Sequence, residues 1–561
     1  MIYLWLVDLW WRVVVAAVNQ EGYYSVKRPI SARLLASRRA LAVLSLTAVL
    51  ALCAHQGSAS ASPTLTEIST DTITASTTDS AYHHTEVEPD TFAFGNTEVA
   101  VFQVGRFSNG GADAAGWATY TNGAWQHGLL PALTTNQTPA GSYPRVSDPS
   151  IAYDAKHGVW LASTLAISGP TGDNILISSS PDGVNWSPPV QVLGTGQTSL
   201  DKDWIVCDDT SSSPYYGNCY STWDDVNNND LPQTSTSSDG GLHWSAPAAP
   251  APTTTQAEGL GGQPLVQPNG TLIVPLWGDS QNAIDDYIST NGGASYSQEM
   301  HVGDITVHGN SGGLRTEPLP SAEMDSSGKV YVVWQDCYFR ANCSSNDIVM
   351  STSTDGITWT AKTRIPIDPV NSTVDHFIPG IAVDRSTSGS SAHLALTYYY
   401  YPQTNCTATT CQLDVGAITS NDGGSLWSAP QQLAGPMSLS WLPNAYGPMV
   451  GDYISTSFLN SVAIPVFAVA KAPNGTVLDQ GMYSTAYTVG NPTVARVSRL
   501  SIHVQHGVSS LRWYATGAIT GFNVYDGSVK INRQLVTSRT HWYYFATHRH
   551  LHHLRILAVR P

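Results

Sequence analysis

Charged residues are scarce in this chain, and that scarcity excludes several classes of protein. Only 12% of the 561 residues are Asp, Glu, Lys or Arg, whereas glycine (47), proline (33) and tryptophan (17) are frequent. Disordered chains are rich in charge and helical bundles are rich in strong helix formers, so neither class fits. The composition favours a turn-rich all-β protein, and the length predicts two or more structural units.

Basic residues are especially rare in most of the chain. Residues 62–490 contain 11 Lys or Arg against 39 Asp or Glu, whereas residues 492–561 contain 9 against 1. An acidic surface repels phosphate groups, which argues against nucleic-acid binding by the body. The basic tail is expected to be a separate domain whose charge attracts anionic cell-wall polymers.

Long apolar runs are also absent from the expected mature protein. The run Ala40–Ala54 follows basic residues and precedes small ones, which is typical of a secretory signal over residues 26–61 and too short for a comfortable membrane span. Residues 1–25 are either an extra segment or a start placed too early, and residues 62–87 are predicted to be a Ser/Thr-rich linker. We therefore predict a secreted, extracellular, monomeric protein, with lipidation at Cys53 as an open alternative.

The few cysteines have a spacing that predicts disulfides. Apart from Cys53, six cysteines form three close pairs: Cys207/Cys219, Cys337/Cys343 and Cys406/Cys411. Even, short-range pairing in a secreted chain predicts three local disulfides. No zinc-ligand spacing surrounds these pairs, and the His548–His553 tract is interpreted as a basic strand end.

One short acidic and aromatic turn recurs along the body, first as "SSSPDGVNW" over residues 178–186. Its acidic or amide position returns at Asp182, Asp239, Asn291, Asp355 and Asp422, and four copies end in Trp186, Trp244, Trp359 and Trp427. Four short segments rich in β-branched and aromatic residues accompany each turn, which is typical of a β-propeller blade. We predict six blades over residues 88–490, with seven as the alternative, and expect the N-terminal strands "EVAVFQVG" and "GWATYT" to complete the ring.

The turn resembles the Asp box, or BNR repeat, of the sialidase superfamily, and the resemblance covers roughly residues 88–490. In such a turn glycine permits left-handed backbone and the acidic side chain accepts hydrogen bonds from turn amides, while the tryptophan packs between blades. We therefore interpret the repeated acids as structural. The resemblance implies the propeller fold and leaves the activity open, because one fold hosts many functions.

The propeller layout places candidate chemistry on the face opposite these turns. The starts of first strands and the ends of second strands share that face, where propeller ligands enter, and we call it the mouth. It is expected to gather Arg145, Asp148, Asp201, Lys202, Asp203, Arg315, Glu317, Asp375, His376 and Tyr446, together with Asp224, Asp279 and Asp336.

The resemblance implies roles for these residues, since sialidases bind a carboxylate with three arginines and use a tyrosine nucleophile, a glutamate base and an aspartate acid. By position, Arg145 and Arg315 correspond to two arginines, with Arg340 or Arg385 as the third. Tyr446 is the candidate nucleophile, Glu317 or Glu258 its base, and Asp148 or Asp203 the acid. Further substrate contacts are expected from Lys202, Asp201, Asp375, His376 and Asp336. The sialidase Arg-Ile-Pro motif is replaced by "YPRVSDP", and the literal Arg364–Pro366 falls in an outer strand.

Three classes of function remain open. A sialidase-like, exo-acting glycoside hydrolase on cell-surface or extracellular glycans is favoured. The alternatives are a polysaccharide hydrolase or lyase that uses paired carboxylates, and a non-catalytic propeller that binds glycan or protein. The acid-rich mouth suits a neutral sugar better than an anionic one.

No cofactor is expected to be required. The run "DDVNNND" makes Asp224, Asp225 and Asp230 a weaker candidate for a structural Ca²⁺ site. Residues 492–561 are predicted to form a small β-sandwich similar to a fibronectin type III module.

Overall fold

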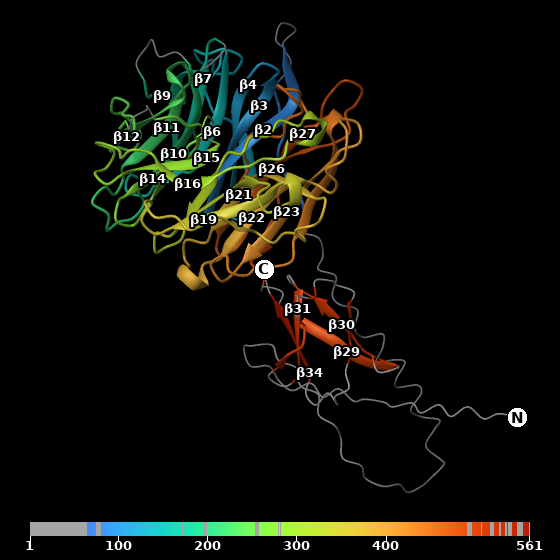
Figure 1. The fold of residues 1–561 in the computed structure, drawn as a ribbon. Coiled ribbons are helices and arrows are strands. Elements are labelled where there is room, and N and C mark those ends of the chain that lie inside the picture. Colours follow the sequence, from blue (N-terminus) through green and yellow to red (C-terminus); the bar gives the residue numbers. More distant parts are fainter. Residues whose placement is uncertain are drawn as a thin grey trace, which may run out of the picture. The chain divides into compact units, whose positions relative to one another are not determined.

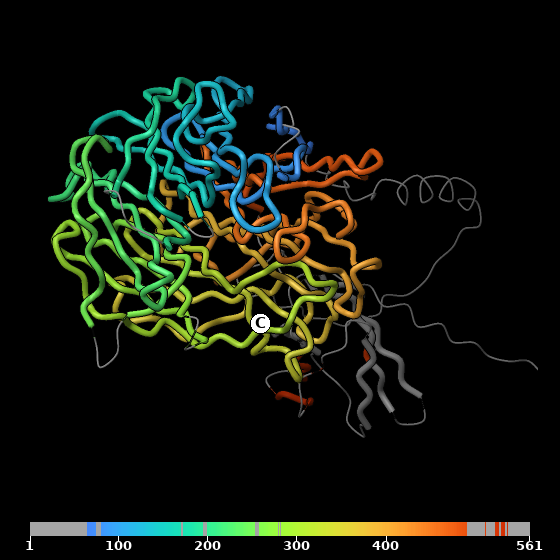
Figure 2. Tube along the Cα trace, turned by 90° about the horizontal axis from the view of Figure 1, so that it is seen from above, coloured from blue at the N-terminus to red at the C-terminus, as the bar shows by residue number. Residues whose placement is uncertain are grey.

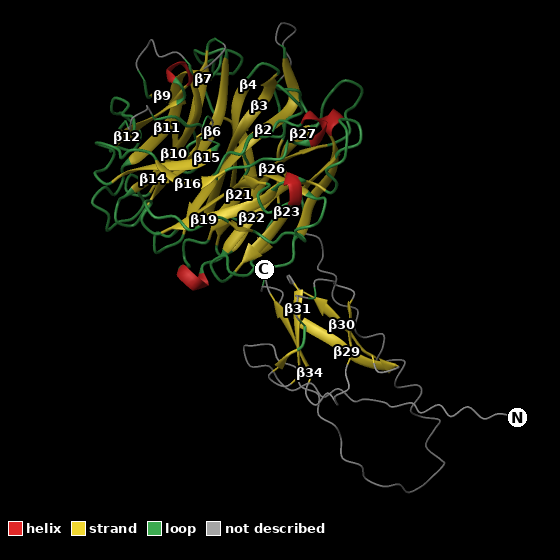
Figure 3. Cartoon of the chain, in the orientation of Figure 1, coloured by secondary structure: helices red, strands yellow, loops and turns green. Residues whose placement is uncertain are grey.

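The computed structural model describes residues 64–73, 80–169, 172–193, 199–252, 257–278, 280 and 282–490, and the strands between residues 496 and 559. The predicted signal segment, Cys53, Asp279 and His548–His553 lie outside the described residues. The chain divides into two compact units, of which the larger spans Pro63–Pro492. Both units are all-β, as predicted, and the described helices are single 3-10 turns (Figure 3), none of which has the length and apolar character to cross a membrane.

The larger unit consists of successive antiparallel groups of strands (Figure 1). The first group is β2 (Ala81–Phe94), β3 (Thr97–Phe107), β4 (Ala112–Thr121) and β5 (Ala124–Leu129). The second is β6 (Arg145–Asp154), β7 (Val159–Ile167), β8 (Gly172–Ser180) and β9 (Val190–Gln191). The third is β10 (Leu200–Cys207), β11 (Cys219–Asp225) and β12 (Leu231–Ser237), with a bridge from Thr234 to Ala248 in the outer position.

Three further groups repeat this meander. The fourth is β13 (Leu265–Val266), β14 (Leu272–Gly278), β15 (Ala283–Ser289) and β16 (Met300–Asp304). The fifth is β17 (Ser321–Met324), β18 (Val330–Asp336), β19 (Asp347–Ser353) and β20 (Thr363–Arg364). The sixth is β21 (Asp375–Val383), β22 (Leu394–Tyr401), β23 (Gln412–Ser420) and β24 (Gln431–Ser438).

A seventh group joins the two ends of the unit. It contains β25 (Ser455–Leu459), β26 (Val462–Ala470) and β27 (Gln480–Ser484), and β1 (Thr66–Ser69) pairs with β27 as its outer strand. The outer strand of the seventh group therefore comes from the predicted linker, residues 62–87. The strands "EVAVFQVG" and "GWATYT", which were expected to complete the ring, are β3 and β4 of the first group. The described strands thus form seven groups, where six blades, with seven as the alternative, were expected from the sequence.

The innermost strands follow one another around a common axis. Contacts run from β2 through β6, β10, β13, β17 and β21 to β25, and β25 contacts β2 (Figure 2). One cavity of about 40 Å³ is lined by all seven inner strands, through Thr91, Ile151, Ile205, Leu265, Ala322, Ile381 and Ser455. This volume admits a few water molecules and no sugar ring.

The repeated turns have the structural role that was predicted. Asp182 Oδ1 accepts backbone N–H groups of Val184 (2.9 Å) and Asn185 (2.8 Å), and Trp186 Nε1 donates to Gly183 O at 3.1 Å. Burial alone would raise the pKa of Asp182, but the hydrogen bonds from Asn185 and Val184 lower it to about 2. The side chains of Asp239, Asn291, Asp355 and Asp422 likewise accept backbone N–H groups of their turns.

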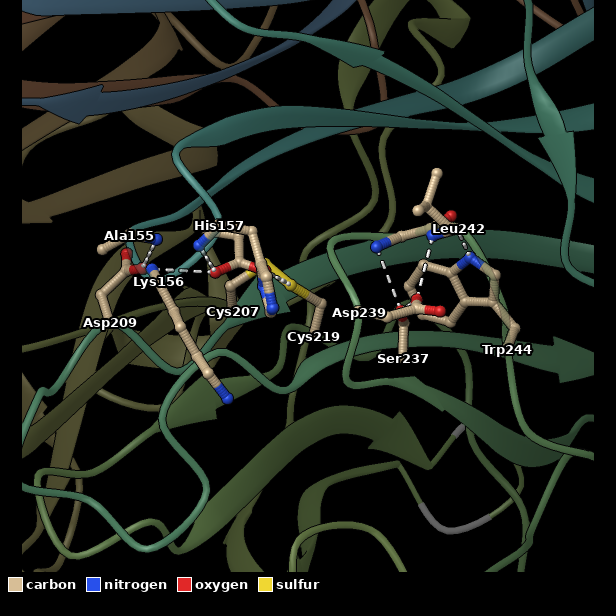
Figure 4. Close-up of a disulfide and its surroundings, with 12 residues drawn as sticks. Ala155, Lys156, His157, Cys207, Asp209, Cys219, Ser237, Asp239, Leu242 and Trp244 are labelled. Atoms are coloured by element: carbon tan, nitrogen blue, oxygen red, sulfur yellow. Dashed lines mark hydrogen bonds and ion pairs between the residues drawn. A yellow bond between two sulfur atoms is a disulfide. The ribbon is translucent and has the colours of Figure 1, made fainter.

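The three predicted disulfides are present: Cys207–Cys219, Cys337–Cys343 and Cys406–Cys411. The first joins β10 to β11, and Figure 4 shows it with Lys156 and His157 on one side and the Asp239 turn on the other. Each disulfide closes a loop within one strand group, so the pairing follows from the short sequence separation.

The smaller unit contains two antiparallel sheets of three strands. One is β29 (Arg496–Gln505), β30 (Val508–Thr516) and β33 (His541–Ala546); the other is β32 (Val529–Lys530), β31 (Gly521–Asp526) and β34 (Leu554–Val559). Leu511, Phe522 and Val524 are buried. The strands of the tail belong to the second of the two compact units.

We expect β1 to stabilise the larger unit from its position as the last outer strand. Ile68 is 2% exposed and packs in a large hydrophobic cluster, so Ile68→Ala should lower the free energy of unfolding by about 2–5 kcal/mol in denaturant titrations of the full chain. Thr66→Ala, at an exposed position of the same strand, should change it by less than about 0.5 kcal/mol. Equal midpoints for the two variants would show that β1 does not complete the group.

Candidate active site

Several inner strands carry a β-bulge. The register shifts near residue 88 in β2, near 148 in β6, near 202 in β10 and near 378 in β21. At these bulges Glu88, Asp148, Lys202 and Ile378 have φ of 54°, 43°, 51° and 50°. Non-glycine residues rarely adopt positive φ, and bulges redirect side chains, often beside functional sites. Three of the four residues are ionisable, so the bulges place charged groups at the predicted mouth.

Asp452, just before β25, connects two cations of the mouth. Its carboxylate accepts hydrogen bonds from Arg315 Nε at 2.7 Å and from Arg315 Nη2, and it binds Lys202 Nζ. Burial opposes ionisation of Asp452, but these cations hold the pKa of its carboxyl well below the usual range. Burial would also lower the pKa of Lys202, yet Asp452 and Asp148 raise it. Three segments distant in sequence are thereby joined by one buried ion cluster.

Glu88 extends this cluster on the side of the first group. Its carboxylate accepts hydrogen bonds from Gln103 Nε2 and from the backbone N of Asp452 (3.3 Å), and Arg106 Nη1 lies 4.0 Å away. Burial, followed by the charges of Asp452 and Asp148, raises the pKa of Glu88 to about 8. The sequence prediction missed Glu88 and Asp452. "VEPD" repeats the acid–proline pattern of "SDPS" and "TEPLP", and that signal would have found Glu88.

Asp148 and Asp201 form a carboxyl pair beside Lys202. Burial, and next the charge of Asp148, raises the pKa of Asp201 to about 7, and the two side chains hydrogen-bond. Asp201 Oδ1 also accepts the backbone N–H of Lys202 at 3.0 Å. Asp148 is buried, whereas Asp201 is only half-buried. The pair therefore holds a proton near neutral pH at a partly accessible position.

Asp203 and Asp224 lie behind this pair and are fully buried. Asp203 accepts a hydrogen bond from Ser163 Oγ, and neither oxygen of Asp224 has a hydrogen-bond partner among the described residues. Burial raises the pKa of both carboxyls well above its usual range. Burial thus disfavours the charged form of both carboxyls, which lessens the negative charge that the acid count of the mouth suggested.

Arg145, Tyr446 and Glu317 are three further residues that the sequence predicts for the mouth. Arg145 donates from Nη1 to Gly110 O (2.6 Å) and from Nη2 to Gly169 O (2.7 Å), and it interacts electrostatically with Tyr446. Tyr446 has φ 59° and is 76% exposed. Glu317 is half-buried and its charge acts on Arg315. The structure thus brings Arg145 near Tyr446 and Glu317 near Arg315.

Neither Arg340 nor Arg385, the candidates for the third arginine, binds a group of the mouth cluster. Arg340 is fully buried and binds Asp347, Asp368 and the carbonyl oxygens of Pro369 and Ser372. Arg385 pairs with Glu323 at 3.3 Å beside the axial cavity. Acids close to Arg340 and Arg385 neutralise them locally, so neither supplies the third arginine that was expected.

Four other predicted residues also have internal partners. Asp336 binds Lys362 Nζ at 2.6 Å, and Asp375 accepts the backbone N of Asn346 at 2.7 Å. His376 is buried against Tyr398 and Tyr400. Glu258 binds Ser280 and not Tyr446.

Among the described residues, one group of three acidic or His side chains has ligand atoms within 4.8 Å of one another: Asp347, Asp368 and His376. Arg340 and Arg364 already neutralise its two carboxylates, so the group is a salt-bridge network. The Ca²⁺ candidates Asp224, Asp225 and Asp230 do not form such a group.

Comparisons with known proteins give structural similarity alone. No protein-family model and no curated protein matches the chain. Among solved structures, the Hadza microbial sialidase is 13% identical over 72% of this chain and 66% of that chain, with a TM-score of 0.41. The phage phi92 endosialidase is 13% identical over 86% and 75% (TM-score 0.43), and an α-L-arabinofuranosidase of Fusarium graminearum is 16% identical over 53% and 85% (TM-score 0.33). These scores lie below 0.5, so they transfer no activity to this chain.

The mouth predicts a pH dependence of stability. Because the pKa of Glu88 is raised from 4.5 to about 8 on folding, its contribution to stability is complete below 4.5 and is lost as the pH rises towards 8. The free energy of unfolding should therefore fall over this range, and Glu88→Gln should make that fall shallower in urea titrations. Glu67→Gln, which removes an exposed pair with Lys471, controls for the loss of a charge. An unchanged slope in Glu88→Gln would contradict the buried position of this carboxyl.

Proposed function

We propose that the chain is a glycoside hydrolase with Asp201 as its proton donor, acting on a glycan bound at the mouth. The observation that carries the proposal is Asp201, a half-buried residue whose carboxyl has its pKa raised to about 7 by burial and by Asp148. A general acid must hold its proton near the working pH and still reach the substrate. Asp203, the acid expected from the sequence, is fully buried and does not meet the second condition.

Glu317 is our candidate for the second carboxylate. Glycoside hydrolysis places two carboxyl groups on either side of the scissile bond, roughly 5 Å apart or more. Asp148 and Asp201 are hydrogen-bonded to each other, which is too close for that arrangement. Glu317 comes from a different part of the ring, is half-buried and lies near Arg315. Asp148 then acts as a positioning residue that tunes Asp201.

The sialidase-like mechanism is the second candidate, and the position of Tyr446 favours it. Tyr446 is 76% exposed and lies near Arg145, and both Arg145 and Arg315 are held by hydrogen bonds that fix their orientation. Burial raises the pKa of Asp203 and Asp224 and so disfavours their charged forms, which lessens the repulsion of an anionic sugar that the sequence suggested. The absence of Arg340 from the mouth counts against a three-arginine carboxylate site.

The proposal includes an architecture and a location. The seven strand groups are proposed to be the blades of a β-propeller, supported by the contact of β25 with β2. The two three-stranded sheets of the tail support a fibronectin type III-like sandwich. Secretion, exo-action, a monomeric state and wall attachment through the basic tail rest on the sequence features alone.

The expected activity can be tested with aryl glycosides, including a sialoside, whose leaving groups differ in basicity. Asp201→Asn should lower kcat/KM about 10²–10⁴-fold on substrates with poor leaving groups and much less on nitrophenyl glycosides, because a good leaving group needs no proton. It should also remove the alkaline limb that is expected of the wild type near pH 7. Asp304→Asn, at a largely exposed side chain, is the matched control.

Different outcomes separate the candidate functions. If Asp201→Asn lowers kcat/KM equally on substrates with good and poor leaving groups, Asp201 has only a structural role. Loss of turnover in Tyr446→Phe with Asp201→Asn still active would favour the sialidase-like mechanism. Absence of turnover on every glycoside tested would refute a hydrolase and favour a binding propeller.

A further inference from the structure

We propose a second carbohydrate site, a groove for a neutral sugar residue on the face opposite the mouth. The groove has a volume of about 490 Å³ and lies between the first two strand groups, where the β2–β3 hairpin meets the Asp182 turn. Ligand pockets commonly occupy about 300–1,000 Å³, so one or two sugar rings fit. The proposal is independent of any activity at the mouth.

Aromatic side chains line one side of the groove. Phe94 and Tyr153 stack with ring centroids 4.1 Å apart and planes inclined by 27°, and Trp160 lies 4.9 Å from Tyr153. Phe94 is 39% exposed although it is a large apolar residue. An aromatic face held rigid by stacking and left open to solvent presents an apolar platform, and the apolar C–H face of a sugar ring packs on such a surface.

Polar groups surround the aromatic platform. Asn122 and Gln126 come from the β4–β5 hairpin, and Asn185 from the Asp182 turn. Amides both donate and accept hydrogen bonds, as sugar hydroxyl groups require. Asp182 Oδ1 is occupied by turn amides, whereas Oδ2 accepts one bond from Asn185 Nδ2 at 2.7 Å and retains capacity for a hydroxyl donor.

The charge of the groove selects against acidic sugars. Hydrogen bonds in the turn lower the pKa of Asp182 to about 2 despite the opposing effect of burial, so this carboxylate is ionised at any physiological pH. No Lys or Arg occurs among the described residues that line the groove. A sialic or uronic acid would meet an uncompensated negative charge, whereas a neutral pentose or hexose would not.

The groove is separate from the mouth. Glu88 and Phe94 lie six residues apart on β2, which places them about 20 Å apart along the strand. One sugar ring therefore cannot pack on Phe94 and reach Asp201 at the mouth at the same time. The site is suited to holding a polysaccharide while the mouth acts elsewhere on the same or another chain.

Native affinity electrophoresis of the full chain tests the site, with arabinan, arabinoxylan, a β-glucan and galactomannan as neutral ligands and polysialic acid as the anionic one. At least one neutral polysaccharide should retard the protein. Phe94→Ala and Tyr153→Ala should weaken that binding about tenfold, the effect of losing one aromatic stacking contact. Leu242→Ala is the matched control, since Leu242 is 58% exposed at the corresponding turn of the next group.

The binding test of the groove does not depend on whether the mouth hydrolyses a glycan. Retardation lost in Phe94→Ala, with unchanged turnover of a small aryl glycoside and unchanged thermal unfolding, supports the groove. The inference is overturned if no neutral polysaccharide retards the protein, if Phe94→Ala behaves like Leu242→Ala, or if polysialic acid binding is lost in Phe94→Ala. Failure of the hydrolase proposal alone would leave neutral-polysaccharide binding intact.

Discussion

The mouth of this protein depends on one buried ion cluster, in which Asp452 binds both Lys202 and Arg315. Removing such charges from water is costly, and the cost is offset only when each charge keeps a close partner. Lys202 belongs to β10, whereas Arg315 and Asp452 precede β17 and β25, so the cluster ties together three distant parts of the ring. Glu88, Asp148 and Asp201 surround these charges, and their protonation follows from this arrangement.

Burial changes the pKa of the acidic residues at the mouth, and with it the chemistry that they can perform. Counted in the sequence, the acids of the mouth suggest a strongly negative surface. Within the fold, burial raises the pKa of Asp203 and Asp224 well above its usual range and that of Asp201 to about 7, while Asp452 is neutralised by its cations. The site therefore combines buried acids of raised pKa with fixed cations, a combination suited to the proton transfer that we propose.

Local features were predicted well because short-range geometry decides them. The Asp182 turn is satisfied by its own amides, and the Cys207–Cys219 disulfide closes a loop within one strand group. Residues whose partners lie elsewhere were predicted poorly. Arg340 was expected at the mouth, but Asp347 and Asp368 neutralise it in a separate network. Six units were expected because the strands that are β3 and β4 were assigned to the last unit, whereas its outer strand is β1, from the predicted linker.

The sequence by itself determined the all-β class, the repeated four-stranded unit, the disulfide pairs and the face on which charges gather. Each follows from periodicity or from contacts between neighbouring residues. Only the tertiary structure decided that β1 completes the seventh group, that Glu88 and Asp452 belong to the mouth, and that Phe94 and Tyr153 stack beside the Asp182 turn. These facts depend on bulges, on closure of the ring and on burial, which bring together residues up to hundreds of positions apart.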